Sequence, residues 1–202
     1  MSVMTISYQR QPEDWERDLD DRRFEEQVKA ALNVMRLRFQ DFTSAHDMPD
    51  LVLLMTIGDQ RVNVALELKE KRQRYRQRWE QLARIPERDL FALDEVAARK
   101  LLPFAPYAFL LYHDDTGRGR PYVLYSILDL LCAPKVRAQR SINLRNERLK
   151  AKWLLNRLHG RAYAGLNDAL LDLVAYLERD LARDLRGLGP HGRYEGETVE
   201  TL

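Results

Sequence analysis

Residues 51–69 read LVLLMTIGDQRVNVALELK, in which two apolar runs flank a short polar turn and the second run ends in charge. The first run, Leu51 to Thr56, is typical of a buried strand. Gly58-Asp59 suits a two-residue type II′ turn, because a leading glycine tolerates the positive φ that this turn requires. The second run, Arg61 to Lys69, then returns beside the first, so the stretch predicts a β-hairpin.

The turn fixes which residues of the two strands face each other. With Gly58-Asp59 as the turn, Asp50 lies opposite Glu67. Directly opposed side chains share one face of the sheet, with Cβ atoms about 4.5–5.5 Å apart. Strand alternation adds Lys69 to that face. A different turn length would shift the register, so the prediction is conditional on the two-residue turn.

Two opposed carboxylates and a lysine have a chemical use. Carboxylates this close repel each other unless a proton or a cation lies between them. Oxygen ligands suit Mg²⁺ or Mn²⁺, and a neighbouring ammonium group can stabilise negative charge that develops on a phosphate. The alternative is that Glu-x-Lys on one strand face is only a solvated charge pair. The joint pattern favours a site that hydrolyses phosphodiesters.

The rest of the chain predicts one α/β domain with a mixed order of elements. The core is expected at about 20–127, a helical extension at about 128–186, and a tail without ordered structure at 187–202. Apolar periodicity and turn residues predict helices at about 19–38, 71–83, 94–102, 139–159 and 165–186, and further strands at 107–113 and 122–127.

Three short motifs, in this order, resemble those of the PD-(D/E)XK nuclease superfamily, which includes many restriction endonucleases and archaeal-type Holliday junction resolvases. They are FEEQV at 24–28 on the first helix, Pro49-Asp50 before a strand, and Glu67-Leu68-Lys69 at the end of the next strand. The resemblance covers about residues 20–127. It implies a restriction endonuclease-like core, a mixed central sheet flanked by helices, and a Mg²⁺- or Mn²⁺-dependent endonuclease acting on DNA.

The resemblance also implies roles for the matched residues. Asp50 and Glu67 would be metal ligands together with the backbone carbonyl of Leu68, and Lys69 would position or activate the attacking water. Glu25 on the first helix would support the metal directly or through water. Its neighbour Glu26 is the alternative, which the sequence leaves open.

One family feature is missing from its expected place. Many members carry a glutamine on the helix after Glu-x-Lys, but the helix expected at 94–102 has none. Arg99 or Lys100 would have to substitute. The glutamines Gln73, Gln77 and Gln81 lie instead on the basic segment that directly follows Lys69.

Net charge is only +2, yet basic residues are concentrated in two segments, 69–78 and 135–152. Beside a nuclease-like site such segments predict contacts to nucleic-acid phosphates. Tyr75 and Trp79 lie four residues apart in the first segment and would dock this helix or stack on bases, with docking favoured. The expected nucleic-acid contacts are Lys71, Arg72, Arg74, Arg76, Arg78, Arg145 and Arg148.

Other classes of function find little support. There is no P-loop or G-x-S-x-G pattern, and the single cysteine, Cys132, permits no intrachain disulfide. No apolar run is long enough for a bilayer, so the cytoplasm is the expected location. His46 and Ser44, shortly before Asp50, are further candidates for phosphate contact. A homodimer would supply the two sites that duplex cleavage needs. The rival function is a nucleic-acid-binding or interaction module on the same fold with little or no catalysis.

Overall fold

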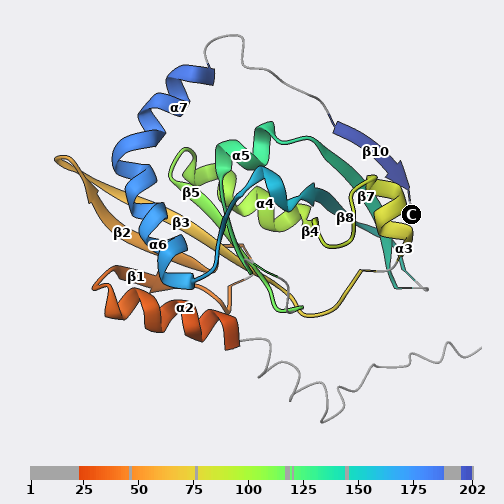
Figure 1. Cartoon of the computed structure of the whole chain (residues 1–202), viewed down its shortest axis with the longest axis horizontal. Coiled ribbons are helices and arrows are strands. Elements are labelled where there is room, and N and C mark those ends of the chain that lie inside the picture. The colour runs from red at the N-terminus through yellow and green to blue at the C-terminus, as the bar shows by residue number, and fades with distance from the viewer. Residues whose placement is uncertain are drawn as a thin grey trace, which may run out of the picture.

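The computed structural model describes residues 23–45, 47–75, 77–116, 119, 121–143, 146–188 and 197–201. The first half of the chain contains α2 (Arg23–Val34), β1 (Arg38–Asp41), β2 (Leu51–Ile57), β3 (Gln60–Lys71), α3 (Gln77–Ala83), β4 (Leu90–Asp94), α4 (Glu95–Leu101) and η1 (Leu102–Phe104). The second half contains β5 (Ala108–Asp114), β6 (Tyr122–Ser126), α5 (Ile127–Cys132), β7 (Lys135–Asn143), β8 (Asn146–Asn156), η2 (Arg157–His159), β9 (Arg161–Tyr163), α6 (Leu166–Ala175), the π-helical η3 (Tyr176–Asp180), α7 (Leu181–Leu188) and β10 (Glu197–Thr201) (Figure 1).

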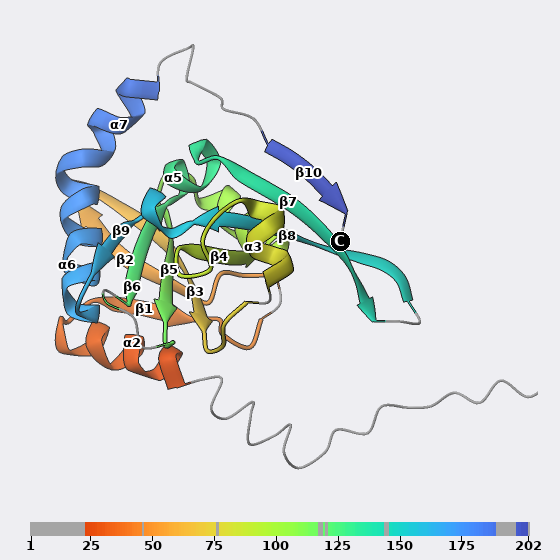
Figure 2. The ribbon, with the colours of Figure 1, turned by 45° about the vertical axis from the view of Figure 1, so that its right-hand side comes forward.

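A six-stranded mixed sheet forms the centre, in the order β1-β2-β3-β5-β6-β9. β3 runs antiparallel to β2 and parallel to β5. A parallel pair requires a crossover connection, and here the crossover contains α3, β4 and α4. A smaller four-stranded sheet, β10-β7-β8-β4, lies beside it and carries the long β7–β8 hairpin that projects from the body in Figure 2.

The central sheet is covered on both faces, and β3 contributes to both. Its residues Val64, Leu66 and Leu68 pack with α2 and α6 in one apolar cluster. Ala65 packs in a second cluster with residues of α4, α5, β4 and β8. Because successive side chains of a strand alternate, Glu67 and Lys69 belong to the α4 side. The α/β fold class is confirmed.

The hairpin register is confirmed as well. Leu51 pairs with Leu66 and Ile57 with Gln60, so the loop between the strands has two residues. Gly58 has φ of 57°, which a type II′ turn requires at its first central residue. The short turn therefore places Asp50 where the sequence predicted, one step beyond the paired ladder.

The helix expected at 139–159 is wrong, because most of this segment forms the β7–β8 hairpin. Trp153 and Leu155 pack in the α4-side cluster, whereas Leu154 packs in a third cluster with Leu90 and Ala138. Consecutive apolar residues here reflect a strand buried on both faces, not a helix stripe. The extension is thus part sheet, although α6, η3 and α7 confirm the helices expected at 165–186.

Three other expectations change. The segment 71–83 begins as strand, since β3 continues to Lys71 and α3 starts only at Gln77. The tail contains β10, which pairs in parallel with β7, while 189–196 and 202 lie outside the described residues. The first helix ends at Val34, short of the expected 38, and its expected start also lies outside them. The helix from Asp94 and the strands β5 and β6 are confirmed.

Candidate active site

Asp50 is held at the start of β2 by the backbone of the neighbouring strands. Its side chain is 7% exposed. The Leu68 amide donates a hydrogen bond to Asp50 Oδ2 at 2.7 Å, and the Asp50 carbonyl accepts one from the Phe42 amide at 2.8 Å. The carboxylate therefore reaches across from β2 to β3 and is fixed beside Glu67.

Glu67 is a fully buried carboxylate, with 0% exposure. Lys69 Nζ lies 2.9 Å from Glu67 Oε1 and 4.0 Å from Asp50 Oδ2, so the ammonium group neighbours both carboxylates. Apart from this contact with Lys69, neither oxygen of Glu67 receives a hydrogen bond from the described residues. A buried carboxylate normally has its hydrogen-bonding capacity filled, so Glu67 retains capacity to accept a cation.

The pKa values of Glu67 and Lys69 are both shifted from their ordinary values by burial and by neighbouring charges. Burial raises the pKa of Glu67, and the charge of Asp50 raises it further, while Lys69 and Lys100 oppose the shift. Burial by itself lowers the pKa of Lys69, but the negative charges of Glu67 and Asp50 outweigh it, and the net pKa is raised. One ammonium therefore only partly compensates two buried carboxylates.

The helix α4 carries the two residues that were expected to substitute for the missing glutamine. The positive charge of Lys100 opposes the rise in the pKa of Glu67. Arg99 instead pairs with Glu95 and is 66% exposed. The electrostatic effect on Glu67 therefore favours Lys100 over Arg99 as the substitute.

The structure also separates Glu25 from Glu26. Glu25 lines the cleft beside Lys69, whereas Glu26 is 65% exposed and pairs with Lys29. Glu25 does not join Asp50 and Glu67 in a three-ligand group: the described part of the chain contains no cluster of three His, Cys, Asp or Glu side chains that could hold a metal. Its helix packs on the opposite face of β3 from Glu67, which accounts for the separation.

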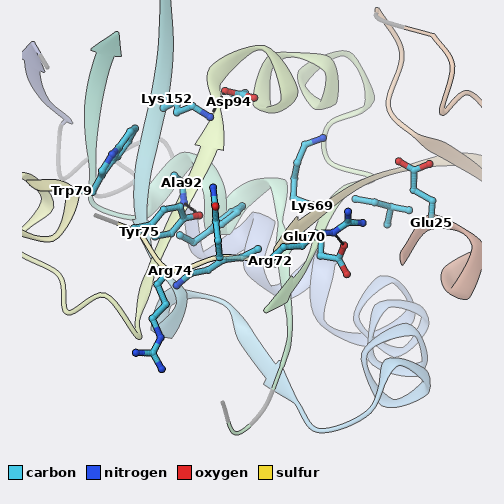
Figure 3. A pocket seen from close by; sticks show the side chains of 14 residues that line it. Glu25, Lys69, Glu70, Arg72, Arg74, Tyr75, Trp79, Ala92, Asp94 and Lys152 are labelled. Carbon is cyan, nitrogen blue, oxygen red and sulfur yellow. Dashed lines mark hydrogen bonds and ion pairs between the residues drawn. The ribbon is translucent and has the colours of Figure 1, made fainter. Parts of the chain in front are cut away.

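A cleft of about 1220 Å³ opens where β3 ends (Figure 3). It is lined on one side by Glu25, Leu68 and Lys69 and on the other by Tyr75, Trp79 and Lys152. Asp50 and Glu67 do not line it. Lys69 thus stands between the cleft and the carboxylates, and a cation from the cleft would reach Glu67 by displacing this ammonium.

The described basic residues of segment 69–78 differ in burial and in whether they line the cleft. The prediction that Lys71 contacts nucleic acid is corrected: its side chain is 2% exposed, and Nζ pairs with Glu87 Oε1 at 2.8 Å. Nζ also donates to the Glu87 carbonyl at 3.0 Å, so Lys71 is structural. Arg72 and Arg74 line the cleft, while Arg78 is exposed on α3 but is not part of the lining.

The remaining expected contacts are not tested by the described residues. Arg76, Arg145 and His46 lie outside them. Arg148 lies on β8, but only its backbone is described. Ser44 is exposed.

Two acidic residues of the cleft were missed. Asp94, at the end of β4, lines the cleft, pairs with Lys152 at 2.7 Å and raises the pKa of Lys69. Glu70 alternates away from Lys69 on β3, but both residues line the cleft at the strand end. Glu70 pairs with Arg72 and, at 2.9 Å, with His113 Nδ1. Alternation places Glu70 on the opposite face from Lys69, so the sequence could not predict that both residues line one cleft.

The donor set fits a hard divalent cation. Asp50 and Glu67 supply carboxylate oxygens, the Leu68 carbonyl follows Glu67 on the same strand, and among the described residues the Glu67 oxygens have no donor besides Lys69. Mg²⁺ and Mn²⁺ prefer oxygen ligands, and Mg²⁺ commonly binds through one or two carboxylates with water in its other positions. Two carboxylates are therefore enough for such a site.

No protein-family model and no curated protein matches the chain. The solved structures similar to it include two that act on nucleic acid by name. A Holliday junction resolvase, Hjc, from Archaeoglobus fulgidus has 13% sequence identity and a TM-score of 0.35, with 71% of this chain and 96% of that chain covered. D212, a nuclease from a fusselovirus, has 9% identity and a TM-score of 0.42, with 89% and 99% covered. Among the described residues, no helix has the length and apolar character needed to cross a membrane.

Proposed function

We propose that this chain is a metal-dependent DNA endonuclease that hydrolyses phosphodiester bonds. The observation that carries the proposal is the pairing of two buried carboxylates, Asp50 and Glu67, with Lys69 as a cation beside both. Among the described residues, Lys69 is the one donor that contacts the Glu67 oxygens. Burying such a charge is costly unless it binds a cation, so a purely structural role accounts poorly for it.

The residues would divide the work as follows. A divalent cation held by Asp50, Glu67 and the Leu68 carbonyl would act as a Lewis acid and lower the pKa of a bound water. Lys69 would donate hydrogen bonds to the attacking water or to a phosphate oxygen, and its positive charge stabilises the added negative charge. Lys100 would add positive charge from α4. Arg72 and Arg74 would hold the neighbouring phosphates along the cleft.

The test is nicking of supercoiled plasmid and of branched DNA in Mg²⁺ or Mn²⁺. We expect cleavage by the unmodified chain, its loss on chelation, and its loss in Asp50→Asn and Glu67→Gln. Asp59→Asn is the matched control, because it removes the same charge from the exposed turn of the same hairpin. Cleavage that survives in both site variants would refute the site.

The rival function, a binding module without catalysis, is favoured by one observation: Glu67 is fully buried and does not line the cleft. Such a module would bind DNA equally well with and without a divalent cation and would cleave under no metal. The same plasmid assay, run beside a gel-shift titration in chelator, separates the two functions.

A further inference from the structure

The end of the cleft away from Lys69 has an aromatic wall that the chemistry of cleavage does not use. Tyr75 and Trp79 line it, and Arg74 and Lys152 also belong to the cleft lining (Figure 3). These residues come from the segment before α3, from α3 itself and from β8. An aromatic wall beside cations is the combination that holds bases and phosphates of single strands.

Tyr75 is the fixed part of this wall. Its hydroxyl accepts a hydrogen bond from the Ala92 amide at 3.1 Å, and Lys71 Nζ lies 4.6 Å from its ring centre. Its own amide donates to Glu87 Oε1 at 3.2 Å. Docking therefore accounts for Tyr75, and its ring cannot turn toward a ligand without breaking these contacts.

Trp79 packs beside Tyr75, and part of its surface stays accessible. The two ring centres lie 6.3 Å apart at 33°, and Trp79 packs against the cluster around Leu90 and Leu154 while staying partly exposed and lining the cleft. Trp153, by contrast, is 8% exposed and has Lys135 Nζ 5.1 Å from its ring centre. Trp79 therefore combines a fixed position with an accessible surface.

Arg74 supplies a positive charge to the same cleft. It is exposed and lines the cleft, and no hydrogen bond or ion pair joins it to another described residue. Lys71 and Lys152, in contrast, are paired with Glu87 and Asp94. The cleft therefore offers an accessible indole for a base and, from Arg74, a cation for a phosphate.

We infer that Trp79 and Arg74 form a subsite that stacks one unpaired nucleobase of the strand whose phosphate lies at Lys69. This rests on the proposed function and names its substrate class: nucleic acid with unpaired bases next to the cleaved phosphate, such as an overhang, a flap or an open branch point. Bases within a duplex are covered by their neighbours, and extruding one costs a few kcal/mol. Stacking on an aromatic ring is tolerant of base identity, so the subsite selects unpaired bases of any sequence.

The test measures binding without cleavage, on the full chain carrying Lys69→Met in chelator. Probes are a twelve-nucleotide thymidine strand, a strand of equal length made of abasic residues, and a blunt twelve-base-pair duplex. We expect the thymidine strand to quench tryptophan emission and to bind at least about fivefold more tightly than the abasic strand, from about 1–3 kcal/mol for one stacked base. Equal affinity for the thymidine and abasic strands would overturn the subsite.

Two variants assign the effect to the ring. Trp79→Leu keeps an apolar side chain against the cluster around Leu90 and Leu154 but removes stacking. The preference for thymidine over abasic strands should therefore disappear, while duplex binding changes less than about twofold. Trp79→Phe keeps a smaller ring and should retain part of the preference; it also isolates the emission of Trp79 by difference. An unchanged preference in Trp79→Leu, or a parallel loss for strand and duplex, contradicts the proposal.

The two proposals fail separately. Quenching and base-dependent affinity without any cleavage by the unmodified chain would remove the nuclease function and leave the subsite. Metal-dependent cleavage with no difference between thymidine and abasic strands would leave the nuclease function and remove the subsite.

Discussion

Two lysines on β3, two residues apart, each pair with a carboxylate, and the two pairs differ. Lys71 lies 2.8 Å from Glu87 and also donates to the Glu87 carbonyl at 3.0 Å. Lys69 lies 2.9 Å from Glu67 but faces a second carboxylate, and no other described residue donates to the Glu67 oxygens. The first pair is satisfied and holds the strand end to its neighbours. The second is left with excess negative charge, which is the property that a cation-binding site needs.

The largest expected effect is on cleavage. Lys69→Met should lower the rate of plasmid nicking at least about 100-fold, because a positioned proton donor and its charge are lost. Lys71→Met, assayed where circular dichroism shows the fold intact, should leave the rate per folded molecule unchanged, because its ammonium is turned to Glu87 and backbone carbonyls. Equal losses in both variants would contradict the distinction between the pairs.

Stability should show the reverse order. Lys71→Met leaves Glu87 and two carbonyls without their donor and should lower the free energy of unfolding by about 3–5 kcal/mol. Lys69→Met should cost less, because Lys69 is one-third exposed and Glu67 can take up a proton in response. Urea unfolding at neutral pH, without divalent cations, measures both. A larger loss for Lys69→Met would mean that this pair, too, is structural.

The hairpin that carries Glu67 was predictable because Gly58-Asp59 fixes the loop at two residues and alternation then fixes the faces. Lys69 and Lys71 both lie at the end of β3 and alternation puts them on one face, so the strand pattern does not show that Lys71 is buried. Their difference comes from Asp50 and from the carbonyls of Glu87 and Leu90, which are tertiary neighbours.

The cleft was not predictable for the same reason. It requires Asp94 and Lys152, contributed by strands β4 and β8. The sequence pattern did not predict β4 as a strand. The apolar run at 153–155 in β8 favours a helix, because consecutive apolar residues also occur on buried helices. In the structure both faces of this segment are buried, and it pairs with β4 as a strand.

Affinity for Mn²⁺ should also differ between variants of the Lys69–Glu67 pair and of the Lys71–Glu87 pair, with a smaller effect. If the Lys69 ammonium competes for the oxygens of Glu67, Lys69→Met should bind Mn²⁺ more tightly, with about 1.4 kcal/mol of extra stabilisation for each tenfold gain in affinity at saturating metal. The readout is the rise in melting temperature on adding Mn²⁺. Glu87→Gln, the matched control at the other pair, should show the same rise as the unmodified chain, and Glu67→Gln little or none. Weaker Mn²⁺ binding by Lys69→Met would refute the competition.

The smallest effect concerns pH. Because the pKa of Glu67 is raised in the fold, the folded state holds this proton more tightly than the unfolded state, and stability is lost as pH rises through the folded pKa. Without metal, Glu67→Gln should therefore be more stable than the unmodified chain at neutral pH by on the order of 1 kcal/mol. The difference should vanish below the ordinary glutamate pKa, where both forms are neutral. Glu26→Gln, at an exposed site, should show no such trend, and a constant difference across pH would contradict the raised pKa.

The most direct test of the central claim is a crystal structure grown with Mn²⁺ and read by anomalous scattering. We expect one Mn²⁺ coordinated by Asp50 and Glu67, with the Lys69 ammonium moved out of its contact with Glu67. Anomalous density elsewhere in the chain, or Mn²⁺-saturated crystals in which Lys69 still pairs with Glu67, would contradict the account.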